Sequence, residues 1–146
     1  MIRANFEQAR ALDRLGEGLR VLMLAAPDAT GRDALTARLQ ATGAQVEPAD
    51  EIYAALGDLL DDPCDYGLFV MDCDSFGGIQ AGRRAAALVG QLNHPVPVIL
   101  VTRDCAEQHF PDDWREPAVL RAPVSAVSLR VGMEQLLLHR FDWDRA

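Results

Sequence analysis

An aspartate and a threonine each stand directly after an apolar segment, where buried strands are expected to end. Asp72 follows residues 67–71, and Thr102 follows residues 96–101. In open α/β sheets the working site lies at the carboxyl ends of the strands. A carboxylate there can act as a nucleophile toward a phosphoryl group, and a hydroxyl can hydrogen-bond a phosphoryl oxygen. The sequence leaves a plainer alternative open, in which Asp72 caps a turn and Thr102 only closes a strand.

Asp74, two residues beyond Asp72, adds a second carboxylate to this site. Carboxylate oxygens are the ligands that Mg²⁺ prefers, although one or two of them hold the ion weakly. Asp72 and Asp74 are therefore predicted as weak metal ligands, and no cofactor is predicted with certainty. Asp28 is the other candidate for a second carboxylate, but its simpler role is the N-cap of a helix.

The composition excludes several classes of function. The chain has 146 residues, and all 14 of its basic residues are arginine, so that lysine chemistry is absent. Its 22 acidic residues give a net charge of −8, which argues against a nucleic-acid partner. No apolar run approaches the ~20 residues of a membrane span, and the first 20 residues lack the apolar core of a secretory signal. A cytoplasmic protein with reduced cysteines is expected.

Short apolar runs alternate with segments that have helical periodicity, which predicts a doubly wound parallel α/β sheet. Strands are expected at residues 21–26, 45–47, 67–71, 96–101 and 118–120. Helices are expected at residues 28–42, 52–60, 79–92 and 125–137. Asp28, Asp50 and Ser125 are the expected N-caps. The polar segment 103–116 is predicted to be a loop or a weak helix.

The residues from Arg20 to Leu138 resemble the receiver domains of two-component response regulators. The matching pieces are residues 66–73, 97–102 and 119–123. The resemblance implies a five-stranded parallel sheet with five helices. It also implies that Asp72 accepts a phosphoryl group from a histidine kinase or phosphotransferase, that Thr102 contacts this group, and that Pro123 follows a cis peptide bond. Residues 20–140 are thus the expected receiver-like domain, between an extension (1–19) and a tail (141–146).

Several positions depart from the receiver pattern, and three of them concern the metal and the cation. Ala25 and Ala26 stand where the family has two acidic Mg²⁺ ligands, and Ala122 stands where it has a lysine. Arg121 is next to the lost lysine, but neighbouring strand residues point to opposite faces. Phosphoryl transfer needs the charge of the transferred group neutralised. The expectation is an atypical receiver with impaired or absent phosphorylation, which docks on a histidine kinase, a phosphotransferase or an output protein.

The N-terminal residues 3–19 carry Phe6, Leu12, Leu15 and Leu19 at helical spacing. This predicts an extra helix outside the receiver pattern, whose apolar stripe must be covered. In the receiver family the fourth helix, fifth strand and fifth helix commonly form a dimer face. A homodimer is therefore favoured, and a monomer that covers its own stripe is the alternative.

Asp72 and Asp74 also resemble the first motif of haloacid-dehalogenase-type phosphohydrolases, in which the first aspartate is the nucleophile and the second the acid/base. Thr102 would then match the second motif, and Asp112 with Asp113 the acidic metal pair. Two β–α units precede Asp72, whereas that family usually opens with this strand. The cation of its third motif, usually lysine, is also missing.

Overall fold

The computed structural model describes residues 15–61 and 65–145. Five parallel strands form one sheet in the order β2-β1-β3-β4-β5. The strands are β1 (Arg20–Leu24), β2 (Gln45–Ala49), β3 (Leu68–Asp72), β4 (Val98–Thr102) and β5 (Ala118–Arg121). Most of the predicted N-terminal helix lies outside the described residues.

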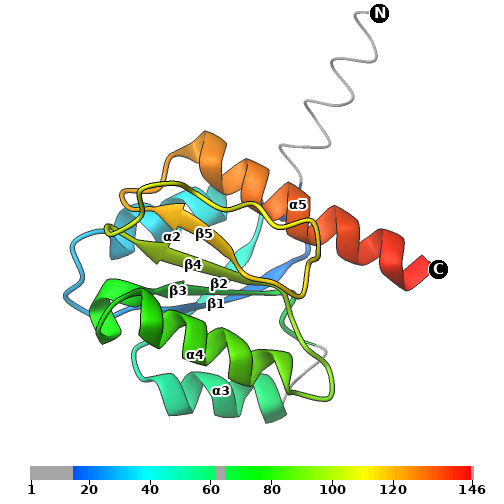
Figure 1. Ribbon diagram of the computed structural model, residues 1–146, viewed down its shortest axis with the longest axis horizontal. Coiled ribbons are helices and arrows are strands. Elements are labelled where there is room, and N and C mark those ends of the chain that lie inside the picture. Colours follow the sequence, from blue (N-terminus) through cyan, green and yellow to red (C-terminus); the bar gives the residue numbers. More distant parts are fainter. Residues whose placement is uncertain (1–14, 62–64, 146) are drawn as a thin grey trace, which may run out of the picture.

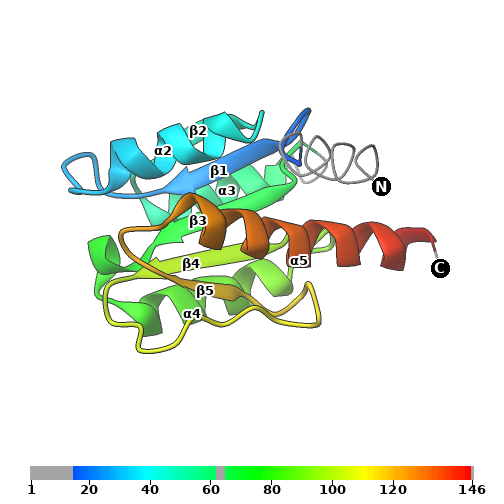
Figure 2. The ribbon, with the colours of Figure 1, turned by 90° about the horizontal axis from the view of Figure 1, so that it is seen from above.

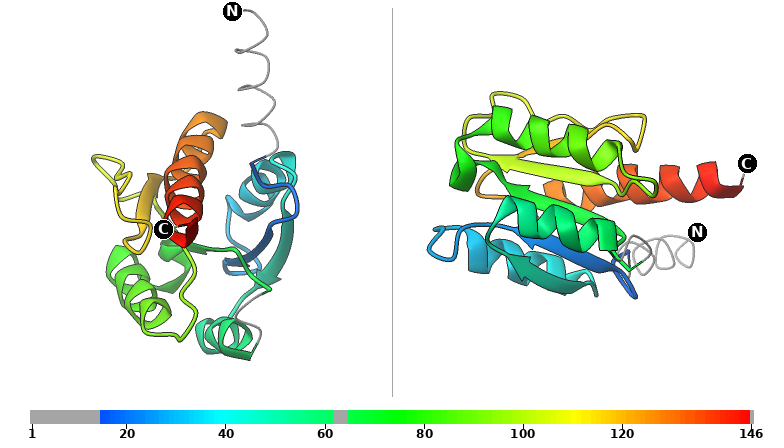
Figure 3. Two further views of the ribbon diagram at one scale, coloured as in Figure 1. Left: turned by 90° about the vertical axis from the view of Figure 1, so that its right-hand side faces the viewer. Right: turned by 90° about the horizontal axis from the view of Figure 1, so that it is seen from below.

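Helices cover both faces of the sheet. They are α2 (Arg32–Ala41), α3 (Ile52–Asp61), α4 (Ile79–Gly90) and α5 (Ala126–Arg145), with the short 3₁₀ helix η1 (Cys73–Phe76) after β3. Figure 1 and Figure 2 show α2 and α5 on one face and α3 and α4 on the other. Figure 3 shows α5 extending beyond the ends of the strands. The predicted doubly wound α/β fold is confirmed. Among the described residues, no helix has both the length and the apolar character to cross a membrane.

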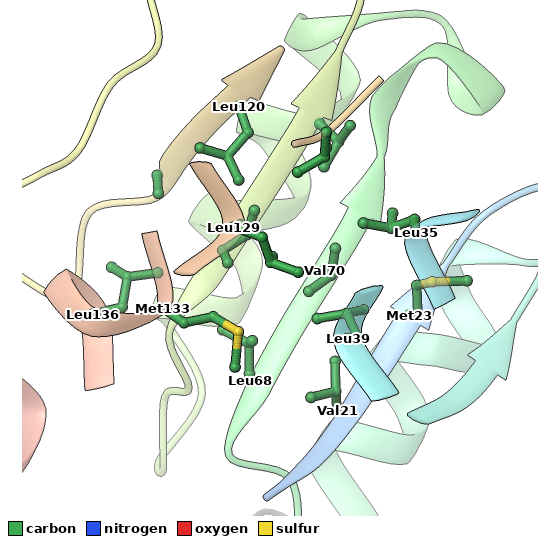
Figure 4. Close-up of a cluster of buried hydrophobic side chains, with 14 of the residues drawn as sticks. Val21, Met23, Leu35, Leu39, Leu68, Val70, Leu120, Leu129, Met133 and Leu136 are labelled. Atoms are coloured by element: carbon green, nitrogen blue, oxygen red, sulfur yellow. The ribbon is translucent and has the colours of Figure 1, made fainter. Parts of the chain in front are cut away.

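The core consists of two layers of side chains that alternate along each strand, because successive strand residues point to opposite faces. On β3, Leu68 and Val70 pack toward α2 and α5 (Figure 4). Phe69 and Met71 pack toward α3 and α4. Both layers are shielded from water, which explains why the central strands read as unbroken apolar runs.

The segment between β4 and β5 contains no α-helix. It runs along the outer edge of β5, where His109 and Val119 form an antiparallel bridge (Figure 2). The Arg121 guanidinium donates to the carbonyl of Cys105 at 2.7 Å and to that of Ala106. The predicted loop is confirmed, and the helix that the family resemblance implied here is missing. The opposite edge of the sheet is β2, which contains Pro48.

Two of the three predicted N-caps are wrong. Helix α2 begins at Arg32 behind Gly31, with no side-chain cap, so Asp28 lies in the preceding loop. Glu51 rather than Asp50 caps α3, because its carboxylate accepts the N–H groups of residues 53 and 54. The third is confirmed, since the Ser125 hydroxyl accepts the N–H of Ser128 at 3.0 Å. Asp50 and Glu51 are adjacent acidic residues, and the sequence pattern does not show which of them caps α3.

The described chain enters the domain beside β1. Leu15 and Leu19 pack against the core layer that α2 and α5 cover. A Cβ atom on Gly67 would lie 2.1 Å from a Leu19 methyl carbon, so the chain approaches the start of β3 closely here. The stripe residues that the structure describes are therefore partly covered by their own domain. The division into extension, domain and tail stays a prediction.

Candidate functional site

Asp72 and Thr102 end neighbouring strands. In the register of β3 and β4, Asp72 pairs with Val101, so Thr102 lies one residue beyond it on the same edge of the sheet. Thr102 is fully buried and Asp72 is half-buried. The sequence therefore identified two side chains that the fold brings to one edge.

The Asp72 carboxylate is tied to the loop after β1 through a serine hydroxyl. Ser75 Oγ donates to Asp72 Oδ2 at 2.8 Å. Ser75 Oγ also accepts the backbone N–H of Ala26 at 3.1 Å. A neutral hydroxyl thus joins the ends of β1 and β3, next to the positions where the receiver pattern has acidic metal ligands.

The Thr102 hydroxyl is turned to Asp74 rather than to Asp72. Thr102 Oγ1 donates to Asp74 Oδ1 at 2.8 Å, and the backbone N–H of Arg103 donates to Asp74 Oδ2 at 2.8 Å. Thr102 Oγ1 also accepts the N–H of Asp104 at 3.2 Å. Asp74 therefore fastens η1 to the end of β4, with both of its carboxylate oxygens in hydrogen bonds.

A cavity of about 620 Å³ opens beside Asp72. Its walls come from the β1–α2 loop, one face of α2, the ends of β3 and β4, and the loop between β5 and α5. Charged groups of both signs line it: Asp28, Asp72, Asp74, Arg32, Arg38 and Arg103. Among the described residues, neither Asp72 nor Asp74 belongs to an ion pair.

The residues at this edge do not fit the Mg²⁺ site of a receiver domain. Ala25 is fully buried and Ala26 is half-buried, and neither carries a ligand oxygen on its side chain. Asp74 is occupied by Thr102 and Arg103. Within the described ranges, no group of three or more acidic, histidine or cysteine side chains could hold a metal ion. The expectation of a weak site at Asp72 and Asp74 gains no third ligand.

The position after β5 that carries a lysine in the receiver family also lacks a charge, because it is Ala122 here. The Ala122–Pro123 peptide bond is cis, as the resemblance implied. Ala122 lines the cavity with a methyl group. The guanidinium of Arg121 bonds to the carbonyls of the β4–β5 segment instead. This confirms that Arg121 does not stand in for the missing lysine.

Cys73, next to Asp72, is a buried thiol. Burial is the main reason that its pKa rises to about 12, and the charges of Asp72 and Asp74 add to the effect. The reactive thiolate is scarce at neutral pH with such a pKa. Cys73 therefore packs as a small apolar group and supplies no nucleophile.

Ser75 is the site residue that the sequence did not single out. The available signal was weak, since a serine three residues after a strand-end aspartate is an ordinary turn residue. Its importance comes from the Ala26 N–H, which lies 49 positions away in the sequence. Only the fold brings that donor to the serine.

A second hollow lies between α3 and α4 on the opposite face of the sheet. It has a volume of about 470 Å³ and is lined by Tyr53, Leu60 and Leu88, among others. These three side chains are exposed to 75%, 61% and 45%. The described surface therefore carries an apolar patch over α3 and α4.

The phosphohydrolase alternative finds no metal pair at the site. Asp112 and Asp113 do not line the cavity beside Asp72. They lie in the β4–β5 segment, where the Asp113 carboxylate bonds to the backbone and guanidinium of Arg115. The two aspartates that this alternative needs are thus placed away from Asp72.

The comparisons with solved structures find receiver domains. A receiver domain of the hybrid histidine kinase CckA is 20% identical, with a TM-score of 0.56 over 81% of this chain and 98% of that one. A variant receiver domain of the histidine kinase CKI1 from Arabidopsis thaliana is 18% identical, with a TM-score of 0.54 over 94% and 96%. No family model matches the sequence, and no curated protein matches it either.

The anti-anti-sigma factor PhyR from Bartonella quintana is also similar in structure. It is 17% identical, with a TM-score of 0.65, and the alignment covers 98% of this chain but only 57% of PhyR. At such low identities the likeness establishes the fold alone. The chain has the receiver-domain fold that its sequence motifs suggested.

Proposed function

We propose that this chain is an atypical receiver module of two-component signalling, which acts by docking on other proteins. In this proposal Mg²⁺-dependent phosphorylation of Asp72 is impaired or absent. The observation that carries it is the Ser75 hydroxyl, which links Asp72 to Ala26 where the receiver pattern has a metal between acidic groups.

The electrostatics of the edge support this proposal. A phosphoryl group attached to the Asp72 carboxylate would carry about two negative charges at pH 7. Receiver domains offset such charge with a metal and a lysine ammonium, and Ala25, Ala26 and Ala122 supply neither. The Thr102 hydroxyl is committed to Asp74 as well.

The partners in this proposal are signalling proteins: a histidine kinase, a phosphotransferase or an output protein. The apolar patch of Tyr53, Leu60 and Leu88 supports an interaction role, because exposed apolar clusters commonly mark contact surfaces. We place the module in the cytoplasm, which the free thiols of Cys73 and Cys105 support.

Self-association into a homodimer is part of the proposal. The family's dimer face includes a helix between the fourth and fifth strands, and this chain has none there. The proposed dimer therefore rests on the N-terminal stripe of Phe6 and Leu12.

The test is an amide NMR titration of the full chain with beryllofluoride and Mg²⁺, which together imitate the phosphorylated aspartate. We expect the amides of Asp72, Thr102 and β5 to keep their positions at millimolar reagent. Large saturable shifts that disappear in Asp72→Asn but persist in Asp33→Asn would contradict the proposal. Asp33 is a matched control because it is exposed on α2 and does not line the cavity.

A restoring variant makes a negative result informative. Ala26→Asp combined with Ala122→Lys returns one metal ligand and the cation to their family positions. We expect this double variant to show the beryllofluoride-dependent shifts that the natural chain lacks. If neither protein responds, the missing groups are not what prevents phosphorylation.

A further inference from the structure

We propose that the cavity beside Asp72 binds a phosphorylated small molecule of about nucleotide size, without a metal ion. The ligand binds reversibly, with no covalent step. The cavity has a volume of about 620 Å³, which falls within the ~300–1,000 Å³ typical of small-molecule sites. The proposal rests on the proposed function in one respect, that a receiver edge without its metal is free to take another input.

Three arginines line this cavity, two of them on α2 and one directly after β4. Arg32 stands in the first turn of α2, Arg38 in its last turn, and Arg103 directly after β4. Within the described part of the chain, the side chains of Arg38 and Arg103 donate to no protein acceptor. Guanidinium groups match phosphate oxygens in shape and charge. The cavity is lined by as many carboxylates as guanidinium groups, so the case for an anion rests on where the arginines lie and not on the net charge of the lining.

Two of the three carboxylates of the cavity already accept hydrogen bonds, and the third, Asp28, is exposed in the β1–α2 loop. Asp74 has both oxygens in hydrogen bonds with Thr102 and Arg103. Asp72 accepts the Ser75 hydroxyl. Helix α2 runs away from the edge that holds Asp72, so six residues of helix place Arg38 about 9 Å farther along than Arg32. We therefore assign the phosphate groups of the ligand to the α2 arginines. Asp72 remains able to accept hydrogen bonds from hydroxyl groups of the ligand.

The cavity also offers apolar surface for the body of the ligand. Ala34 and Leu35 contribute from α2, Val101 from β4, and Val124 from the loop before α5. Leu35 and Val124 are buried, with 6% and 7% of their surface exposed. Pockets that combine apolar walls with a few convergent polar groups are the usual form of a site for an organic ligand. A phosphate joined to a flat, partly apolar group fits this lining better than free phosphate.

The experiment titrates the full chain with three probes in EDTA: ADP, inorganic pyrophosphate and adenosine. Amide NMR and calorimetry follow each addition. We expect saturable binding of ADP, weaker binding of pyrophosphate and the weakest binding of adenosine, with shifts at Gly31, Arg38 and Val124. Because no Mg²⁺ is present, this result is independent of the beryllofluoride titration, and either proposal can fail alone.

Two arginine variants decide whether the cavity is the site. Arg38→Ala should weaken ADP binding by about tenfold, as expected for the loss of a charge-assisted contact to phosphate. Arg84→Ala is the matched control, since Arg84 is exposed on α4 and outside the cavity. No saturable binding of ADP at millimolar concentrations overturns the proposal. Equal affinities of the two variants for ADP also overturn it, because they reveal unspecific attraction of the anion.

Discussion

At the scale of single residues, Ser75 holds the edge of the sheet together. Its hydroxyl accepts the Ala26 N–H and donates to Asp72, so Ser75→Ala removes two partly buried hydrogen bonds. We expect the free energy of unfolding to fall by about 1–2 kcal/mol, the usual size of such a loss. Urea unfolding measures this change. Hydrogen exchange at the Ala26 amide should become faster at the same time.

Thr30→Ala is the control for this prediction, because Thr30 has an exposed hydroxyl in the same β1–α2 loop. It should leave the stability and the Ala26 exchange rate unchanged. If Ser75→Ala behaves like the control, the hydroxyl bridge contributes nothing to the link between β1 and β3.

The residue-level site was predictable only in part. Asp72 and Thr102 could be placed at one edge because each follows an apolar run, and parallel strands share a carboxyl edge. The pairing of Thr102 with Asp74 could not be predicted, since it depends on the path of η1 after β3. The Ser75 bridge depends likewise on a backbone donor from a distant loop.

At the scale of elements, α4 approaches the sheet closely at Gly82. A Cβ atom there would lie 2.3 Å from Cys73 Sγ and 3.2 Å from a Leu100 methyl carbon. Gly82→Ala should therefore lower the free energy of unfolding by about 1–3 kcal/mol through overpacking. This loss outweighs the ~1 kcal/mol that alanine normally adds within a helix. Chemical denaturation measures the balance.

Gly57→Ala in α3 is expected to have the opposite sign, because a Cβ atom there meets nothing within 4 Å. It should raise the free energy of unfolding by up to ~1 kcal/mol.

Adding Cys73→Ala to Gly82→Ala should recover part of the stability that Gly82→Ala loses, since the Cys73 sulfur is the closest obstacle to the new Cβ atom. A destabilised Gly82→Ala protein that Cys73→Ala does not rescue would assign the strain to another contact.

Helices and strands were predictable because their apolar periodicity reflects the layer that they cover. The expected strand at 96–101 is β4 (Val98–Thr102), and the expected helix at 79–92 is α4 (Ile79–Gly90). Helix starts were less certain, as Asp28 and Asp50 illustrate. Asp28 lies four residues before the start of α2. An aspartate that caps a helix and an aspartate that lies in a loop cannot be told apart by the apolar residue that follows.

At the scale of the whole molecule, the proposed dimer depends on the stripe before β1. Leu12→Glu places a charge on that stripe and should convert a dimer into a monomer, because a buried unpaired carboxylate is costly. Light scattering of the full chain measures the mass, and circular dichroism checks that the fold is kept.

Arg14→Gln is the matched control for the dimer. It changes the net charge by the same amount, and at helical spacing Arg14 lies on the side away from the stripe. We expect it to remain a dimer. A natural chain that already scatters as a monomer contradicts the proposed homodimer.

The cover over β5 has a consequence for how copies of this molecule can meet. Open sheet edges invite strand-by-strand addition and aggregation. Here the bridge from His109 to Val119 occupies the β5 edge, and Pro48 removes a backbone donor from β2 at the other edge. Neither edge offers a full ladder for a continuous intermolecular sheet. Self-association of the folded domain is thereby directed to side-chain surfaces, where it can be reversible and selective.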